Sequence, residues 1–406
     1  MATKYPFEGI RVFELGLYFA APWCTRMLAS FGAEVIRAET TRAPDLVRVF
    51  MGHDPGSMYA DYGALKKHIT LDVRRPKGAE IARELVKKSD VFITNLGKEL
   101  IAPAGLEYSE LKKLKPDIIM VWQPGFGLEG PYSTYRAFGG MLQSVTGMCE
   151  ISGFPDGLPG GAGTAFCDYP SSINAVMLIS AALDQRRRTG EGTFIEIPLY
   201  EVGVASISVP LVDYMANGHV LSRQGNRHPF ASPHGAYPCK GEDRWCVIAV
   251  FTDEEWRRFC EAVGRPEWRE EPKFATLVDR LRNTDDLDRL IAEWTRNYTA
   301  EEVMEKMEQA RVPAGIVMKG EDLSEDSHLK ERGFYLEAEY HAPPMTVGSP
   351  IKGKSVAMRV PMILSETPPR FGPVSRMGED NEYVYGKMLG MSAEEIKQLT
   401  EEGVFA

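Results

Sequence analysis

The chain has 406 residues, of which 44% are hydrophobic and 26% charged, and its formal net charge is −10. This length exceeds what one ordinary core fills, so we expect two domains. The acidic balance argues against a nucleic-acid partner, and no apolar run reaches the roughly 18 residues of a membrane helix. The six cysteines form no Cys-x-x-Cys pair and no signal-peptide core opens the sequence, so we predict a cytoplasmic protein without a metal site, disulfides or membrane contact.

Strands and helices are predicted to alternate in the N-terminal part. Apolar runs predict strands at 9–15, 33–37, 68–72, 90–94, 117–122 and 193–197, with helices at 24–31, 77–88 and 108–114. Repeated strand–helix–strand units imply a parallel sheet, and hence an α/β, Rossmann-like fold. Ligands of such sheets bind at the carboxyl ends of the strands. Residues 16–18, 95–96 and 123–125 are therefore expected to face a ligand.

One acidic residue, Asp168, precedes a strongly apolar helix pattern at 166–183 (FCDYPSSINAVMLISAAL). Pro170 suits the first turn of a helix, where its missing N–H costs nothing. Asp168 should therefore lie at a helix N-terminus, where free N–H groups stabilise a carboxylate. Two interpretations remain open, a helix N-cap and a carboxylate nucleophile.

The composition changes after residue 225. A Pro-, Gly- and His-rich stretch at 226–240 indicates a domain boundary. We predict a large Rossmann-like domain at 1–225, a small α+β domain at 226–330, and a segment at 331–406 that returns to the large domain. Further elements are expected as helices at 200–216 (interrupted by Pro210), 254–263, 284–296, 300–310 and 392–402, and a strand at 245–250.

Two nucleotide-binding motifs match by letter and are rejected on context. Residues 125–130 (GFGLEG) fit G-x-G-x-x-G, but Pro131 follows where the dinucleotide fingerprint needs an opening helix. Residues 348–355 (GSPIKGKS) fit the P-loop pattern, but a strand-like run follows them, and Pro350 removes one N–H from the phosphate cradle.

Several motifs together resemble the family III CoA-transferases, the family of formyl-CoA, carnitine and benzylsuccinate CoA-transferases. They are GIRVFELGLYFAAPWCTRMLASFGAEVIRAE, KKHITLDVRRPKG, GFGLEGPY, the segment around Asp168, and RRRTGEGTFIEIPLYE. The resemblance covers nearly the whole chain. It implies CoA transfer from an acyl-CoA to a free carboxylic acid, with no tightly bound cofactor. It also implies an interlocked dimer, either a homodimer or a heterodimer with a related subunit.

The resemblance also assigns site residues. An aspartate at the position of Asp168 is the family's nucleophile, which forms a mixed anhydride and then an aspartyl-CoA thioester. Glycines at 125–127 or 160–161 could bind the oxyanion. Where relatives often carry an arginine, this chain has Thr40, with Arg42 two residues later. The positions matched to CoA or acyl contacts are Tyr18, Phe19, Arg42, Leu71, Arg74, Asn95, Leu96 and Arg136.

Alternatives within the same fold remain open. Racemases of this fold pair the aspartate with a histidine, and Phe138 stands at the matching position, which disfavours two-sided proton exchange. A non-catalytic subunit of a two-subunit enzyme is another alternative. The GGGGQ loop of formyl-CoA transferase is missing, which disfavours oxalate and formate. The aromatic residues Tyr18, Phe19, Trp122 and Phe138 suggest a bulky or aromatic acid with succinyl-CoA as donor, although core packing explains them equally.

Overall fold

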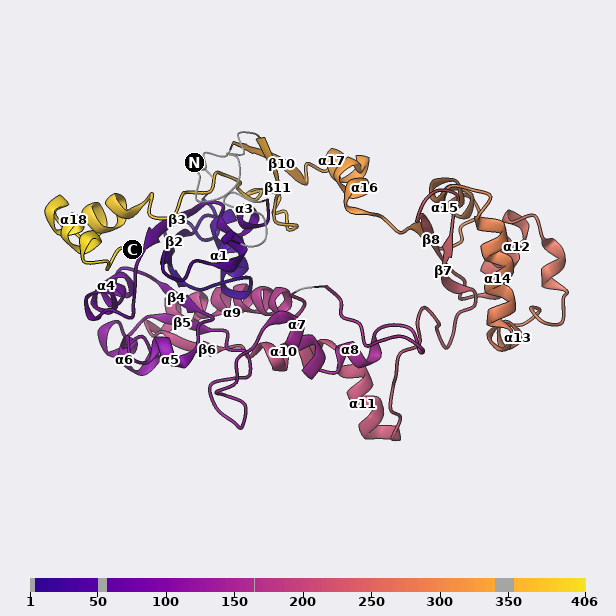
Figure 1. Ribbon diagram of the computed structural model, residues 1–406, viewed down its shortest axis with the longest axis horizontal. Helices are drawn as coiled ribbons and strands as arrows, with labels where there is room; N and C mark the ends of the chain where they lie inside the picture. Colours follow the sequence, from indigo (N-terminus) through magenta and orange to yellow (C-terminus); the bar gives the residue numbers. More distant parts are fainter. Residues whose placement is uncertain (1–3, 50–56, 164, 340–353) are drawn as a thin grey trace. The chain divides into compact units, whose positions relative to one another are not determined.

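The computed structural model describes residues 4–49, 57–163, 165–339 and 354–406. The chain divides into two compact units (Figure 1). The first contains 1–148, 161–219 and 329–406, and the second contains 149–160 and 220–328. The second unit thus begins six residues before the expected boundary at 226, and it also includes the Gly- and Pro-rich loop at 149–160.

A six-stranded parallel sheet forms the centre of the first unit. Its strand order is β3-β2-β1-β4-β5-β6. This confirms the predicted α/β class. The order reverses between β1 and β4, and ligands of open α/β sheets bind beyond the carboxyl ends of the strands at such a switch point. The strands are β1 (Arg11–Leu15), β2 (Glu34–Glu39), β3 (Lys66–Thr70), β4 (Val91–Thr94), β5 (Ile119–Trp122) and β6 (Thr193–Glu196).

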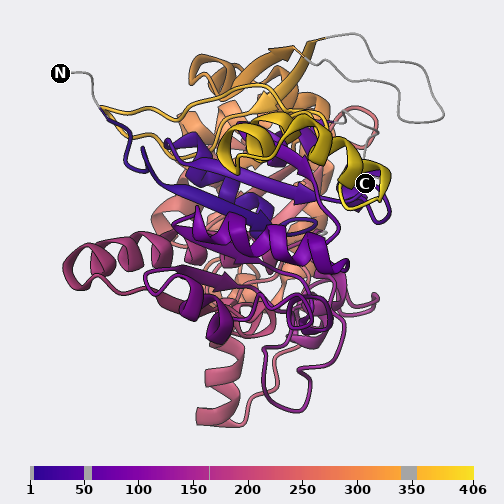
Figure 2. The same cartoon turned by 90° about the vertical axis from the view of Figure 1, so that its left-hand side faces the viewer.

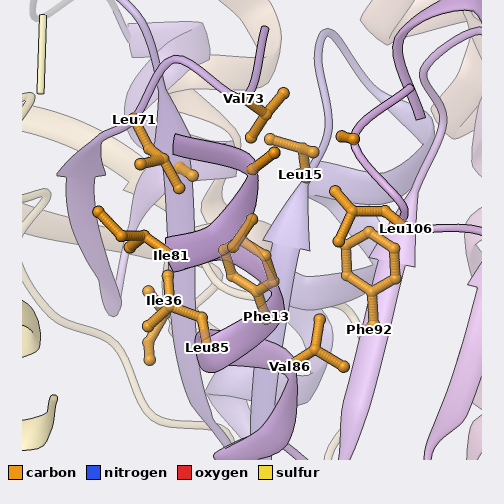
Figure 3. Close-up of a cluster of buried hydrophobic side chains, with 14 of the residues drawn as sticks. Phe13, Leu15, Ile36, Leu71, Val73, Ile81, Leu85, Val86, Phe92 and Leu106 are labelled. Carbon is orange, nitrogen blue, oxygen red and sulfur yellow. The ribbon is translucent and has the colours of Figure 1, made fainter. Parts of the chain in front are cut away.

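Helices cover both faces of this sheet, as its two-sided apolar pattern requires. Alternate strand residues such as Phe13, Ile36 and Phe92 pack against α4 (Pro76–Lys87), and part of this cluster is drawn in Figure 3. The opposite residues, such as Val12 and Val35, pack against α1 (Ala20–Ser30) and α9 (Asp168–Thr189). The predicted buried helix after Asp168 is therefore confirmed, and it runs on to Gly190, which adopts φ 75° and ends it.

The C-terminal segment returns to the first unit. Helix α18 (Ala393–Glu401) is followed by the chain end, marked C in Figures 1 and 2, beside β3. The Asp72 N–H donates to the Val404 carbonyl at 2.8 Å, and the Thr70 hydroxyl donates to the Phe405 carbonyl at 3.1 Å. The other C-terminal elements are β10 (Tyr335–Glu339), β11 (Lys354–Met358) and the π-helix Glu382–Met388.

The second unit has its own core and a three-stranded antiparallel sheet, β7-β8-β9. Two of its helices begin with capping boxes, at Thr252 and Thr299, which satisfy backbone N–H groups of the first turn. Its elements are β7 (His234–Pro238), β8 (Trp245–Ala249), β9 (Ala314–Ile316), α12 (Asp253–Ala262), the 3-10 helix Pro266–Arg269, α13 (Leu277–Arg282), α14 (Thr284–Thr295), α15 (Ala300–Gln309) and α16 (Gly320–Glu325).

The helix expected at 200–216 is two helices, α10 (Leu199–Ser206) and α11 (Ser208–Asn217). The break falls at Ile207, and Pro210 lies in the first turn of α11, where its missing N–H is tolerated. The remaining short helices are α2 (Leu46–Val49), α3 (Ser57–Gly63), α5 (Lys98–Ile101), α6 (Tyr108–Leu114), α7 (Gly139–Val145), α8 (Met148–Ile151) and α17 (Ser327–Glu331).

The structure agrees with the rejection of the dinucleotide motif, and it describes only the last two residues of the P-loop match. No helix opens within residues 125–130, since the next helix after β5 is α7. Residues 348–353 of the P-loop match lie outside the described residues, and its last two, Lys354 and Ser355, begin strand β11.

Candidate active site

The loop after β1 lies at the switch point of the sheet and is fixed by the loop after β4. The Leu17 N–H donates to Asn95 Oδ1 at 2.9 Å, and Asn95 Nδ2 donates to the Leu17 carbonyl at 2.7 Å. A Cβ at Gly16 would lie 2.9 Å from the Cβ of Ala21, so this turn has no room for a side chain there. The carboxyl ends of β1 and β4 thus hold one rigid loop, 16–19, at the place where a ligand is expected.

Asp168 is the first residue of α9, which packs along α1. The two helix starts are joined by Ser172, whose hydroxyl lies 2.7 Å from the Ala20 carbonyl and 2.8 Å from the Asp168 carbonyl. The N-cap residue of α1, Phe19, offers no side-chain hydrogen bond to its own helix. The N-termini of both helices therefore lie beside the Asp168 carboxylate.

The Asp168 carboxylate is buried, with 7% of the residue exposed. Burial raises its pKa to about 6, and the nearby backbone N–H groups of Asp168 and Ala20 oppose this rise. No cation contributes to this shift, and Oδ2 has no hydrogen-bond partner among the described residues. A desolvated carboxylate with one unpaired oxygen is a strong nucleophile that remains mostly ionised at neutral pH.

The neighbouring thiol, Cys167, is buried as well. Burial and the adjacent Asp168 charge raise its pKa to about 11, so it stays protonated and unreactive at neutral pH. Of these two adjacent groups, only the carboxylate is ionised at neutral pH.

Aromatic rings surround the start of α9. The hydroxyls of Tyr62 and Tyr169 lie 2.8 Å apart, and the ring of Phe19 packs against both of these residues. Trp23 makes edge contacts with the same two rings. Burial is the main cause that raises the pKa of Tyr62, with the bond to Tyr169 and the charges of Asp61 and Asp168 acting in the same direction. We call Phe19, Trp23, Tyr62 and Tyr169 the aromatic cluster.

The residues matched to CoA contacts fall into separate groups. Tyr18, Asn95 and Leu96 meet at the switch point, since Asn95 fixes the loop that carries Tyr18. Arg42 and Arg74 both lie beside Asp72, at 3.8 Å and 2.8 Å, with about half of each side chain exposed.

The last two matched residues differ in exposure. Arg136 is exposed in the segment between β5 and α7. Leu71 is 2% exposed in the core, so only its backbone is placed for a contact with CoA.

Trp122, expected among the aromatic residues near the acid, is also buried, and its Nε1 donates to the Leu96 carbonyl at 2.9 Å.

The two glycine segments proposed for the oxyanion are constrained in different ways, the first by hydrogen bonds and the second by packing. The Gly160 N–H donates to the Ser152 carbonyl at 3.1 Å. The Ala162 N–H, just after this segment, donates to Gln143 Oε1 at 2.8 Å. At Gly125, a Cβ would lie 2.2 Å from the Cβ of Ala137, so glycine is required there by packing. Gly160 is thus a poorer oxyanion donor than the sequence suggested.

Within the described ranges, no cluster of three or more His, Cys, Asp or Glu side chains could hold a metal ion. No helix among those residues is long and apolar enough to cross a membrane.

The family model of CoA-transferase family III matches residues 7–373. The chain belongs to this family. It is 33% identical over 405 residues to the succinyl-CoA–D-citramalate CoA-transferase of Chloroflexus aurantiacus, covering 98% of each chain. It is 32% identical over 397 residues to the succinate–glutarate CoA-transferase of Agrobacterium fabrum, covering 95% of this chain and 96% of that one.

The fold of this family III CoA-transferase agrees with a solved structure of a CaiB/BaiF family protein from Brucella suis. The TM-score is 0.85 at 26% identity, over 95% of this chain and 100% of the other. Together with the relatives, this confirms the predicted enzyme class, a transferase acting between acyl-CoA and organic acids.

Sequence reasoning missed the polar groups that support the loop at 16–19. They are Glu14, Arg37, Asp45 and Lys66, all fully buried or nearly so. Glu14, Arg37 and Lys66 lie inside strands β1, β2 and β3, and this position could have predicted a buried ion pair. A charged residue inside a buried strand needs a partner of opposite charge. The position of the Ala20 N–H near Asp168 left no such signal, because a backbone donor has no sequence signature.

Proposed function

We propose that this enzyme transfers CoA from an acyl-CoA to a free carboxylic acid through covalent intermediates on Asp168. The single observation that carries the proposal is the Asp168 carboxylate, which is buried at the start of α9 near the start of α1, and whose Oδ2 has no hydrogen-bond partner among the described residues. A structural acid with this degree of burial would be expected to have a cation or a full set of donors.

Each step exchanges one acyl bond for another. Asp168 attacks the thioester carbonyl and releases CoA thiolate, which leaves a mixed anhydride between Asp168 and the acyl group. The thiolate then attacks the aspartyl carbonyl, releasing the donor acid and forming an aspartyl-CoA thioester. The acceptor carboxylate attacks this thioester, and the released thiolate takes the acceptor acyl group from the second anhydride, which restores Asp168.

The N-termini of α1 and α9 support these steps electrostatically. Their partial positive charge stabilises the carboxylate before the attack and the oxyanions that form at the same place. The buried position also excludes water, which would hydrolyse the anhydride. Arg42, Arg74 and Arg136 are proposed to bind CoA phosphates, since guanidinium groups suit phosphate oxygens.

The acids are proposed to bind against the aromatic cluster. Phe19 and Trp23 offer apolar surface, and the paired hydroxyls of Tyr62 and Tyr169 offer hydrogen bonds to a second polar group. Because relatives named in the comparisons act on succinyl-CoA, citramalate and glutarate, we propose succinyl-CoA as donor and a substituted dicarboxylic acid as acceptor.

A dimer is also proposed. Helix α11 has no buried residue, and apolar side chains are exposed along it and on α9. A second copy, or a related subunit, would cover them. Mass measurement by light scattering tests this, and Val212→Asp should shift a dimer towards monomer. The exposed residues are Val209, Leu211, Val212, Tyr214 and Met215 on α11, and Tyr169, Ile173, Met177 and Leu178 on α9.

Intact-mass analysis tests the covalent mechanism. The protein is incubated with succinyl-CoA alone and quenched in acid. We expect a mass increase equal to CoA minus one water, which maps to the peptide containing Asp168 and is absent in Asp168→Asn. Asp184→Asn, which removes an exposed acid from the far end of the same helix, should retain the adduct. Loss of an α-deuterium label from the substrate without thioester exchange would instead support a racemase, and CoA binding with neither outcome would support a non-catalytic subunit.

A further inference from the structure

A buried ionic network lies directly behind the loop at 16–19. Arg37 of β2 donates to Glu14 Oε1 and to Asp45 Oδ2, each at 2.5 Å. Glu14 Oε2 accepts from Lys66 Nζ at 2.9 Å and from the Thr25 hydroxyl at 2.6 Å. The side chains of Arg37, Glu14, Asp45 and Lys66 are all 0% exposed. A network with this degree of burial holds its members in fixed positions, because any unpaired charge inside would be costly.

Asp45 links this network to the backbone of the loop. Its Oδ2 accepts the Tyr18 N–H at 2.9 Å, and its Oδ1 accepts the Val47 N–H at 2.8 Å. Tyr18 has φ 60°, a left-handed conformation that is unfavourable for a residue with a side chain. The hydrogen bond to Asp45 opposes this cost and keeps the turn in its strained form.

The turn at Tyr18 determines where α1 begins. Leu17 is fixed to Asn95 on one side of the turn, and Ala20 starts the helix on the other. Since Phe19 gives α1 no side-chain cap, the first N–H of the helix, that of Ala20, is available to the Asp168 carboxylate. Three backbone residues, Tyr18, Phe19 and Ala20, therefore connect the Asp45 contact to the start of α1 near Asp168.

We propose that Asp45 is a positioning residue of the transfer reaction, which aims the Ala20 N–H at Asp168 by holding Tyr18 in its left-handed turn. The inference rests on the proposed role of Asp168, and Asp45 itself does not touch the reacting atoms. Its acid is needed because Arg37 fixes it in place, whereas a neutral amide would leave part of the Arg37 charge uncompensated.

The central test is Asp45→Asn, compared with Thr25→Val. Both remove one contact of the same network, but Thr25 bonds only to Glu14 and the Pro22 carbonyl and has no bond to the turn. We expect Asp45→Asn to lower kcat by about tenfold to a hundredfold, with KM for acyl-CoA changed less than about twofold, because misplacement of a catalytic group affects the chemical step. Thr25→Val should lower the melting temperature and leave kcat unchanged.

The pKa of Asp168 gives a second readout that does not need turnover. It is obtained from the pH dependence of the stability difference between each background and its Asp168→Asn counterpart. Tyr62 and Cys167 do not interfere, because both pKa values are raised and lie far above that of Asp168. Asp61 of α3 titrates in the same range, since burial raises its pKa to about 6, and its own contribution cancels because it is present in both members of each pair. Loss of the Ala20 N–H should move the pKa of Asp168 upward from about 6 in Asp45→Asn and leave it unchanged in Thr25→Val.

A Tyr18→Gly background tests the route of the effect. Glycine adopts a left-handed turn without help. Asp45→Asn should therefore cost less in that background than in the native sequence. Equal costs in both backgrounds would contradict an action through the turn. Should Asp45→Asn fail to fold, Tyr18→Pro, which removes the N–H and the left-handed turn, should show the same loss of kcat relative to Tyr18→Ala.

The outcomes separate this inference from the proposed function. Native kcat and an unchanged Asp168 pKa in Asp45→Asn would overturn the positioning role while leaving the nucleophile in place. Absence of transfer and of a covalent adduct in the native enzyme would overturn the proposed function, and the pKa of Asp168 would still decide whether Asp45 positions the turn.

Discussion

Glu14 and Asp168 are two buried carboxylates with opposite surroundings. Burial would raise the pKa of Glu14, but Arg37, Lys66 and the Thr25 hydroxyl hold it below its usual value. Burial raises the pKa of Asp168 to about 6, and only backbone N–H groups oppose the rise. The comparison shows that the partners of a buried acid decide its role. Glu14 is paired with cations, as expected of an acid that holds the fold together, while Asp168 Oδ2 has no partner among the described residues, as the proposed nucleophile requires.

The largest expected difference is in activity. Asp168→Asn should lower the rate of CoA transfer by at least about 10⁴-fold, because the amide cannot form the anhydride. Steady-state assays with succinyl-CoA and an acceptor acid measure the loss. Asp184→Asn should retain native rates. Transfer at a native rate by Asp168→Asn would show that the acid is only part of the helix start.

The second difference is in stability. Glu14→Gln should reduce the free energy of unfolding by about 3–5 kcal/mol, because it leaves two buried cations undercompensated. Chemical denaturation at pH 7.5 measures it. Glu84→Gln is the matched control, since Glu84 pairs with Lys87 on the surface and should cost at most about 1 kcal/mol. A cost for Glu14→Gln as small as that of the control would contradict the structural role of the network.

The third difference is also in stability, but here removal of the acid is expected to stabilise the fold. The pKa of Asp168 is higher in the folded state than the usual 3.8, so the native protein loses stability as the pH rises from about 4 to above 6. Asp168→Asn removes this loss and should stabilise the fold at pH 7.5 relative to pH 4 by up to about 3 kcal/mol. Denaturation curves at both pH values provide the measurement. A variant that is destabilised equally at both would show that the acid has no desolvation cost.

The smallest difference concerns the exposed arginines. Arg74→Ala should raise KM for acyl-CoA by about threefold to tenfold and leave kcat nearly unchanged, with the effect shrinking at high salt because exposed charges are screened. Initial rates at two ionic strengths measure this. Arg187→Ala is the control, since that exposed arginine pairs with Asp184 at the far end of α9. An equal effect of both substitutions would assign Arg74 no specific contact.

The sequence was sufficient to predict the strands and helices of the sheet, because their apolar periodicity is strong. It also singled out Asp168, because a lone acid before an apolar helix has few explanations. The orientation of side chains was harder to predict. Leu71 was matched to a CoA contact by position, and Trp122 was one of the aromatic residues that suggested a bulky acid. Both side chains lie in the core, since residues alternate between faces along and just beyond a strand. The turn at Tyr18 depends on Asp45, which is distant in sequence, so no local pattern predicted it.

Oxygen transfer tests the covalent role of Asp168 most directly. With an acceptor acid labelled with ¹⁸O in its carboxylate, the acceptor oxygen becomes the bridging oxygen of the second anhydride and stays on Asp168 when the thiolate removes the acyl group. After turnover and proteolysis, our account predicts ¹⁸O in the peptide that contains Asp168, in native enzyme and in Asp184→Asn alike. Complete transfer of CoA with no label in that peptide would contradict it.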